Sequence, residues 1–231
     1  MSAADKAGPV RRRPGGAQII PRPNAWVPGG LPAPAAHPLR VTVDDIAAAL
    51  VRAVPGRPIA PAFPDARPSA VLVALADGEE GAEVLLTRRS RALRTHKGEI
   101  SFPGGRMDPG ESPVDTALRE AHEEVGLDPS LVSVFAELDH LSTVVSRSHI
   151  VPVVGRLPAV VPLAPASPEV ERVIWIPIAE LVRPDTYHSE RWGRSPTDRL
   201  LHFFELEDET VWGATAFMLV DLLARIADAA A

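Results

Sequence analysis

The sequence predicts an α/β fold, a three-layer α/β/α sandwich built on a mixed β-sheet. Short apolar runs rich in β-branched residues recur between residues 70 and 212, and turn signals separate them, as is typical of strands. Two longer segments, residues 113–125 and 214–231, place apolar side chains at helical spacing. Strands that alternate with helices imply a sheet covered by helices on both faces.

The first predicted elements form a hairpin. Residues 70–75 indicate a buried strand, residues 78–81 a turn, and residues 83–87 the paired strand. A basic loop at residues 88–105 follows, with a short strand near residues 100–102, and leads into the helix at 113–125. Later strands are predicted at residues 132–138, 149–157, 170–176, 200–206 and 209–212, with a short helix at 177–181 and a terminal helix from residue 214.

The chain divides into an N-terminal arm, residues 1–68, and a folded domain, residues 69–231. The arm holds 13 of the 25 prolines and is basic, which is typical of an extended, partly disordered segment. It either wraps around the domain or a partner subunit, or it is a flexible tail. Because no chemical motif lies in residues 1–35, we expect them to be dispensable for activity.

One part of the arm has helical spacing, residues 43–53. Its residues Ile46, Leu50 and Val51 could face a core. Its start could be capped by Thr42 or Asp44.

The most informative stretch is the helix at 113–125, which carries three carboxylates near its end. Ser112 suits the N-cap, Pro113 the first helical position, and Asp115 completes a capping box. Gly126 stands where a C-terminal cap is expected. Glu120 and Glu124 share a face and Glu123 lies beside them, as suits Mg²⁺ or Mn²⁺; Arg119 can reach Glu123 or Glu111.

The segment from Gly105 to Leu127 resembles the signature of the Nudix hydrolases. That signature is a glycine, five residues, Glu, seven residues, and then Arg-Glu-apolar-any-Glu-Glu-any-Gly-apolar. Every defined position is filled here. The resemblance implies a Nudix-type α/β/α sandwich and a metal-dependent pyrophosphohydrolase.

A second resemblance lies directly upstream, in the basic segment from Leu85 to Gly105. Leu-Leu-Thr-any-Arg-Ser, followed by Arg, Gly and Phe-Pro-Gly-Gly at intervals of three residues, resembles the additional motif of coenzyme A pyrophosphatases within that family. Pro168-Glu169-Val170 resembles the family's later acidic strand, although Ser167 replaces the usual Asn. Basic side chains next to a metal site also suit a polyphosphate on chemical grounds.

These resemblances imply a role for each candidate residue. Glu120 and Glu124 are the expected metal ligands, with Glu123 as the third, and either Glu123 or Glu169 is the general base. Glu111 orients Arg119. The expected substrate-binding residues are Arg89, Ser90, Arg94, Gly104 and Gly105; Ser90 is expected to shape the loop and not to act as a nucleophile.

The implied substrate is a small-molecule diphosphate of the coenzyme A class, cleaved to 3′-phosphoadenosine 5′-phosphate and 4′-phosphopantetheine or its acyl form. One alternative is a Nudix hydrolase of another diphosphate, such as ADP-ribose. A second is a non-catalytic Nudix-fold sensor, which would have no need of three hydrolytic carboxylates.

Composition limits the remaining possibilities. The absence of cysteine excludes disulfides and thiolate metal sites, and the net charge of −6 argues against nucleic-acid binding. Charged residues in the terminal helix argue against a membrane span, and the N-terminus has no apolar secretory segment. We expect a cytoplasmic bacterial protein that could form a homodimer; the basic N-terminus makes mitochondrial import a minor alternative.

Overall fold

The computed structural model describes residues 12–34, 40–52, 56–195 and 198–230. Its larger sheet has the path β4-β3-β2-β8-β6, with β5 on β2, β7 on β8 and β9 on β3. These strands are β2 (Arg67–Gly78), β3 (Gly81–Arg89), β4 (Ile100–Ser101), β5 (Gly104–Arg106), β6 (Ser133–Glu137), β7 (Leu141–Ser142), β8 (Ser148–Arg156) and β9 (Val170–Pro177). Because β2 and β8 are parallel and the other pairs are antiparallel, the sheet is mixed, as predicted.

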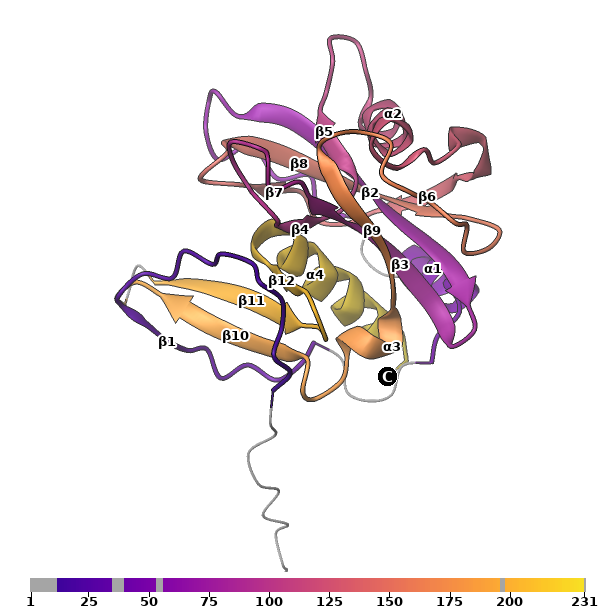
Figure 1. Cartoon of the computed structure of the whole chain (residues 1–231). Helices are drawn as coiled ribbons and strands as arrows, with labels where there is room; N and C mark the ends of the chain where they lie inside the picture. The colour runs from indigo at the N-terminus through magenta and orange to yellow at the C-terminus, as the bar shows by residue number, and fades with distance from the viewer. Residues whose placement is uncertain (1–11, 35–39, 53–55, 196–197, 231) are drawn as a thin grey trace, which may run out of the picture.

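Helices cover both faces of this sheet (Figure 1). Helix α2 (Pro113–Val125) packs on one face through Ala117, Ala121 and Val125, next to the short η1 (Pro129–Leu131). Helix α4 (Gly213–Ala230) and helix α1 (Val43–Arg52) close the other face, with the short α3 (Ile178–Leu181) at its edge. The predicted three-layer α/β arrangement is therefore confirmed.

A second sheet lies beside the first; two of its strands were predicted, at residues 200–206 and 209–212, but a separate sheet was not. It is antiparallel, with the order β1-β10-β11-β12. Its strands are β1 (Trp26–Pro28), β10 (Tyr187–Trp192), β11 (Arg199–Glu205) and β12 (Thr210–Trp212). Helix α4 packs on one of its faces through contacts with β11 and β12. The sequence does not reveal β10, because Ser189 and Glu190 are polar and yet buried.

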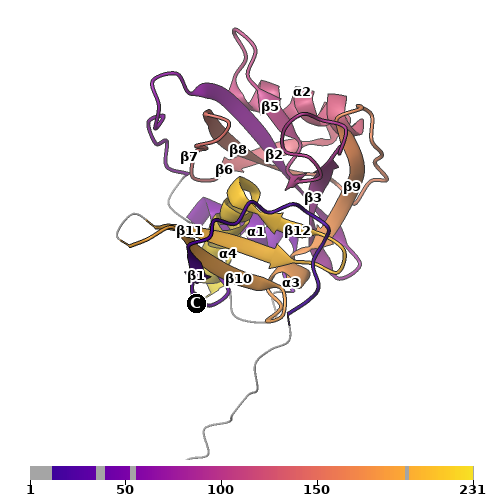
Figure 2. The same ribbon diagram turned by 60° about the vertical axis from the view of Figure 1, so that its left-hand side comes forward.

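The arm wraps around the domain over residues 12–34 (Figure 2). It crosses the second sheet and ends as the edge strand β1, which pairs Trp26 with Trp192 and Pro28 with Glu190. Arg22 donates through Nε to both carboxylate oxygens of Glu190, at 2.9 and 3.0 Å. For these residues the flexible-tail alternative is wrong. The part of the arm predicted to be disordered at residues 1–11 lies outside the described residues.

Helix α1 begins after Thr42, one of the two predicted caps. The Thr42 hydroxyl accepts a hydrogen bond from the Asp45 amide, and the Asp45 carboxylate accepts one from the Thr42 amide. Ile46 and Leu50 are buried as expected, but Val51 is 76% exposed, and its predicted core role is wrong. Val51 lies about 100° around the helix from Leu50, away from the core. Residue 53, the predicted end, lies outside the described residues.

Candidate active site

Helix α2 begins and ends where its capping residues predict. The Ser112 side chain accepts from the Asp115 amide, Asp115 accepts in return from the Ser112 amide, and Pro113 is the first helical residue. Gly126 ends the helix in the left-handed conformation, with φ 71°. Since the apolar face of α2 is fixed on the sheet, its carboxylates are held beside β5.

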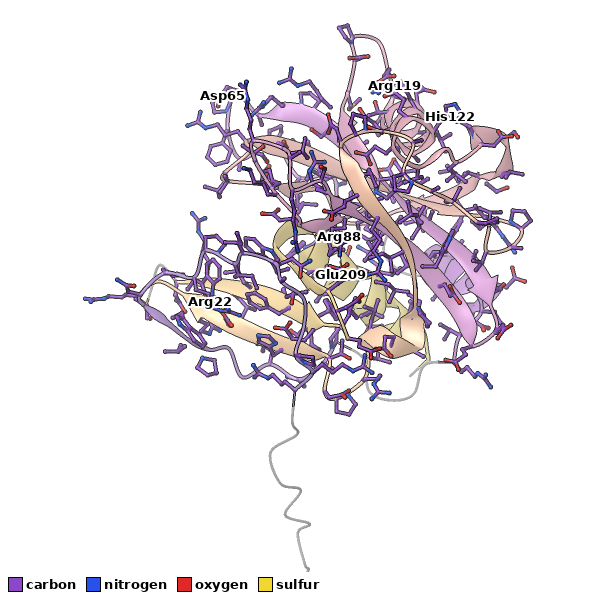
Figure 3. All side chains as sticks on the ribbon, in the orientation of Figure 1. Arg22, Asp65, Arg88, Arg119, His122 and Glu209 are labelled. Atoms are coloured by element: carbon purple, nitrogen blue, oxygen red, sulfur yellow. The ribbon has the colours of Figure 1, made fainter. Side chains whose placement is uncertain are left out.

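Arg119 joins the helix to the preceding loop. Its Nε donates to Glu111 Oε1 at 2.6 Å, and its Nη2 donates to Glu111 Oε2 at 3.0 Å. Its Nη1 reaches Glu120 at 2.9 Å and Glu123 at 3.2 Å. The guanidinium hydrogen bonds lower the pKa of Glu111 to about 2, so that this carboxylate stays charged. The expected Glu111–Arg119 contact is present, and Figure 3 shows Arg119 projecting from α2.

Glu120 and Glu124 are the desolvated carboxylates of the cluster. Burial raises the pKa of Glu124 to about 7, against the opposing effects of Arg89 and the Gly104 amide. Burial also raises the pKa of Glu120, and the charge of Glu169 adds to the shift at both residues. Glu123 is more exposed and makes its contact with Arg119. Glu169 is thus close enough to disfavour the charged forms of Glu120 and Glu124.

Gly104 and Gly105 make room for this cluster. A Cβ on Gly105 would lie 2.5–2.7 Å from the Glu120 carboxylate atoms, and one on Gly104 would lie 2.4 Å from the Ala70 carbonyl oxygen. The Gly104 amide donates to Glu124 Oε2 at 3.3 Å. Both glycines belong to β5, which was predicted as loop and instead pairs with β2. In this structure they hold helix and sheet in close contact.

The ends of β3 and β9 bring Arg89, Ser90 and Glu169 to the same place. Arg89 pairs with Val170 across the two strands, and the Ser90 amide donates to the Glu169 carbonyl at 2.7 Å. Arg89 Nη2 lies 3.2 Å from Glu169 Oε2, and Nη1 lies 3.9 Å from Glu124 Oε1. The Ser90 hydroxyl accepts from the Ala92 amide, so it shapes the loop.

Of the basic segment predicted as a loop at residues 88–105, residues 90–98, hereafter the basic loop, project from this point. This loop closes at its base, where the Arg89 amide donates to the Glu99 carbonyl and the Gly98 amide donates to the Arg89 carbonyl. Arg91, Arg94 and Lys97 are exposed, and within the described ranges no carboxylate forms an ion pair with them. Arg94 is therefore near the carboxylate cluster in the chain but makes no contact with it here.

Glu209 is a residue that the sequence did not single out. It lies in the turn between β11 and β12 and is 1% exposed. Its Oε1 accepts from Arg88 at 2.6 Å and from Arg172 at 3.0 Å. Figure 3 shows Arg88 and Glu209 facing each other between the two sheets. No local signal identifies Glu209, because it stands among several other acidic residues, Glu205, Glu207 and Asp208.

The donor chemistry of the cluster fits Mg²⁺ or Mn²⁺. Within the described residues no three His, Asp or Glu side chains already surround one point as a metal cage would. Mg²⁺ does not require such a cage, since proteins hold it through one or two carboxylates together with water and substrate phosphates. Glu124 is buried and Glu120 is partly buried beside Glu169, and both have raised pKa values, so they are carboxylates that a divalent cation would stabilise.

Three histidines near the site or on the main sheet have local structural partners. His122 contacts the Leu127 carbonyl at the end of α2, His96 contacts Glu99, and His140 contacts Glu137. The Trp175 indole donates to the Val161 carbonyl and packs in the apolar cluster under α2. Among the described residues, no helix is long and apolar enough to cross a bilayer.

Comparison with known proteins identifies relatives of this chain. Residues 66–197 match the family described as NUDIX domain. The chain is 37% identical over 144 residues to the uncharacterized Nudix hydrolase NudL of Yersinia pestis (strain Pestoides F), across 62% of this chain and 72% of the relative. The same figures hold for NudL of Yersinia pseudotuberculosis (serotype O:3, strain YPIII). A solved structure, the Nudix hydrolase RenU of M. smegmatis, aligns with a TM-score of 0.44 and 23% identity, over 50% of this chain and 73% of that one.

Proposed function

This chain belongs to the Nudix family, and on that premise we propose that it is a metal-dependent hydrolase of coenzyme A or its derivatives. The bond cleaved is the diphosphate linkage. The products are 3′-phosphoadenosine 5′-phosphate and 4′-phosphopantetheine, or the acyl form of the latter.

One observation carries the proposal: the carboxylate cluster meets, at Arg89, a group of cations that have no carboxylate partner among the described residues. Arg89 contacts Glu124 and Glu169, and the loop that follows it presents Arg91, Arg94 and Lys97 free of carboxylates among the described residues. Hard oxygen donors beside free guanidinium groups suit a polyphosphate that arrives with a divalent cation. The coenzyme A-type motif across Leu85–Gly105 supports the finer assignment of substrate.

The proposed role of each site residue follows from its position. Glu120 and Glu124 would hold Mg²⁺ or Mn²⁺, with Glu123 as a third ligand; when bound, the ion neutralises phosphate charge and lowers the pKa of its water. Arg119, fixed by Glu111, holds Glu120 in place. Arg89 and Arg94 hold phosphate oxygens. Gly104 and Gly105 contribute by letting α2 and β5 approach each other.

The base is one of two carboxylates, and the geometry favours Glu169. Water attacks phosphorus, a new P–O bond forms, the bridging oxygen leaves with the bonding electrons, and the water proton passes to a carboxylate. The charge of Glu169 acts on both Glu120 and Glu124, whereas the charge of Glu123 acts on Glu120. Each candidate is paired with an arginine at 3.2 Å, Glu169 with Arg89 and Glu123 with Arg119.

A substrate panel tests the proposal. Coenzyme A, acetyl-coenzyme A, 3′-dephospho-coenzyme A and ADP-ribose are each incubated with Mg²⁺ or Mn²⁺, and the products are identified by mass. We expect coenzyme A or its thioester to give the highest kcat/KM and to yield 3′-phosphoadenosine 5′-phosphate. A preference for ADP-ribose would assign the chain to a different diphosphate. Absence of chelator-sensitive hydrolysis on all four substrates would favour a non-catalytic sensor.

A further inference from the structure

We propose that Gln18, in the N-terminal arm, is a positioning residue for the basic loop, which it fastens to the buried carboxylate of Glu209. Its Nε2 donates to Glu209 Oε2 at 2.5 Å and lies 3.1 Å from the Gly98 carbonyl oxygen. Gly98 closes the base of the loop. The inference rests on the proposed function, because it gives a part of the substrate site to a segment outside the Nudix match.

The Gln18 amide group is used in full. Its Oε1 accepts from the Thr210 amide at 2.8 Å, so that one side chain bonds the start of β12, the Glu209 carboxylate and the loop. An asparagine is one methylene shorter and could not reach all three groups. The contact joins residues that are 80 and about 190 positions apart in the chain.

The arm is fitted closely against the turn between β11 and β12. The Gly16 amide donates to Thr210 Oγ1 at 3.0 Å. A Cβ on Gly16 would lie 2.5 Å from the Glu209 Cα, and one on Gly15 would lie 2.5 Å from Thr210 Oγ1. Neither position has room for a side chain, so glycine at both positions lets the arm pack directly against Glu209 and Thr210. The position of Gln18 is thus determined by packing of the arm as well as by hydrogen bonds.

The Glu209 carboxylate is itself held in place by two arginines. Its other oxygen accepts from Arg88 and Arg172, which are directly paired on β3 and β9. Arg89 follows Arg88 and Val170 lies near Arg172, at the strand ends that present Arg89 and Glu169 to the carboxylate cluster. A single carboxylate therefore fixes both strand ends and, through Gln18, the base of the loop.

The loop contributes cations but no carboxylate ligand, so a looser loop should weaken binding of substrate and transition state alike. We expect Gln18→Ala to raise KM for the best diphosphate substrate about three- to tenfold, the effect of losing one hydrogen bond, with kcat within about twofold of wild type. Gln18→Glu should raise KM further, because it sets a second carboxylate against Glu209. A merely structural role would lower the active fraction, and hence kcat, at unchanged KM.

Arg13→Ala is the matched control. Arg13 lies in the same arm and pairs with Glu180 and Asp185, away from Gly98. We expect it to leave KM unchanged. If Arg13→Ala raised KM as much as Gln18→Ala, general docking of the arm would be responsible and the role assigned to Gln18 would be wrong. An unchanged KM in both Gln18 variants would also overturn it.

Hydrogen exchange keeps this test separate from the proposed function. In Gln18→Ala, amides of residues 90–98 should exchange faster than in wild type while those of α2 do not, and Arg13→Ala should show no change in the loop. This readout requires no substrate. If the wild-type protein hydrolyses none of the diphosphate substrates, only the proposed function is contradicted. If the loop amides of Gln18→Ala exchange as slowly as in wild type, the positioning role is contradicted.

Discussion

Arg88 and Arg89 are neighbours on β3, but their side chains point to opposite faces of the main sheet. Arg88 reaches the second sheet and bonds Glu209 at 2.6 Å. Arg89 reaches the face of α2 and lies 3.2 Å from Glu169 and 3.9 Å from Glu124. Strand alternation produces this division. One arginine of the basic segment therefore serves the fold, and the next serves the candidate active site.

Replacing the two arginines should separate stability from activity. Arg88→Met deprives a buried carboxylate of one of its partners, so we expect the free energy of unfolding to fall by about 1–3 kcal/mol. Arg89→Met should change it by less than about 1 kcal/mol, since its partners are more loosely held. Chemical denaturation measures both, and steady-state assays should show the larger loss of kcat/KM in Arg89→Met. If Arg89→Met lost more stability than Arg88→Met, or Arg88→Met lost more kcat/KM, the assignment of Arg88 to the fold and Arg89 to the site would be contradicted.

The proposed metal ligands should be essential for turnover. Glu120→Gln and Glu124→Gln each remove a charged oxygen donor, so we expect kcat to fall at least about a hundredfold, while circular dichroism shows a folded protein. Glu80→Gln, in the exposed turn between β2 and β3, is the control and should retain wild-type turnover. Near-normal turnover of either site variant at saturating metal would refute the ligand assignment.

The raised pKa of Glu124 predicts a pH-dependent stability of the metal-free protein. Burial brings this pKa to about 7, above its ordinary value of 4.5. A carboxyl group with a raised folded-state pKa contributes its full stability below the unfolded pKa and loses it as pH rises through 7. With chelator present, Glu124→Gln should thus be more stable than wild type at pH 8, by about 2–3 kcal/mol, and nearly equal at pH 4.5. If the difference in denaturation midpoint between Glu124→Gln and wild type did not change with pH, the raised pKa of Glu124 would not be its cause.

Local signals predict helix α2 well, because every determinant lies within it or directly next to it. Ser112, Pro113 and Gly126 cap α2, and its apolar spacing decides which face the carboxylates take. The contact between Arg119 and Glu111 follows from the same short stretch. Strands β2, β3, β8 and β9 were also predicted, since each contains a short apolar run.

Strands β11 and β12 were predicted, but β1, β10 and the sheet that they complete could not be, because their determinants are far apart in the chain. Glu190 is buried and paired with Arg22, which lies 168 residues away in the chain. Gln18 gains its partners 80 and about 190 residues further along. A short polar strand such as β10 therefore looks like a loop until the arm is placed on it. The expectation that residues 1–35 are dispensable is replaced by the expectation that their removal raises KM.

Single replacements of the two candidate bases should distinguish them. If Glu169 accepts the water proton, Glu169→Gln should lower kcat by about 10²–10⁴-fold with little change in the metal concentration required. Glu123→Gln should mainly raise that metal concentration. Titrating Mg²⁺ at saturating substrate gives both quantities for each variant. If Glu123→Gln instead has the larger loss of kcat at saturating metal, Glu123 is the base.

Arg94 should determine recognition of the 3′-phosphate. Arg89 is already held by Glu124 and Glu169, beside the expected position of the diphosphate, whereas Arg94 is exposed and has no carboxylate partner among the described residues. A charge-assisted hydrogen bond to phosphate contributes roughly 1.5–3 kcal/mol, or about ten- to a hundredfold in kcat/KM. We therefore expect Arg94→Ala to lower kcat/KM for coenzyme A by that factor more than for 3′-dephospho-coenzyme A. Arg89→Ala should lower both values equally, and Arg91→Ala tests the neighbouring cation. Equal losses on the two substrates in Arg94→Ala would mean that Arg94 holds the diphosphate or the loop, and a selective loss in Arg91→Ala would move the 3′-phosphate to Arg91.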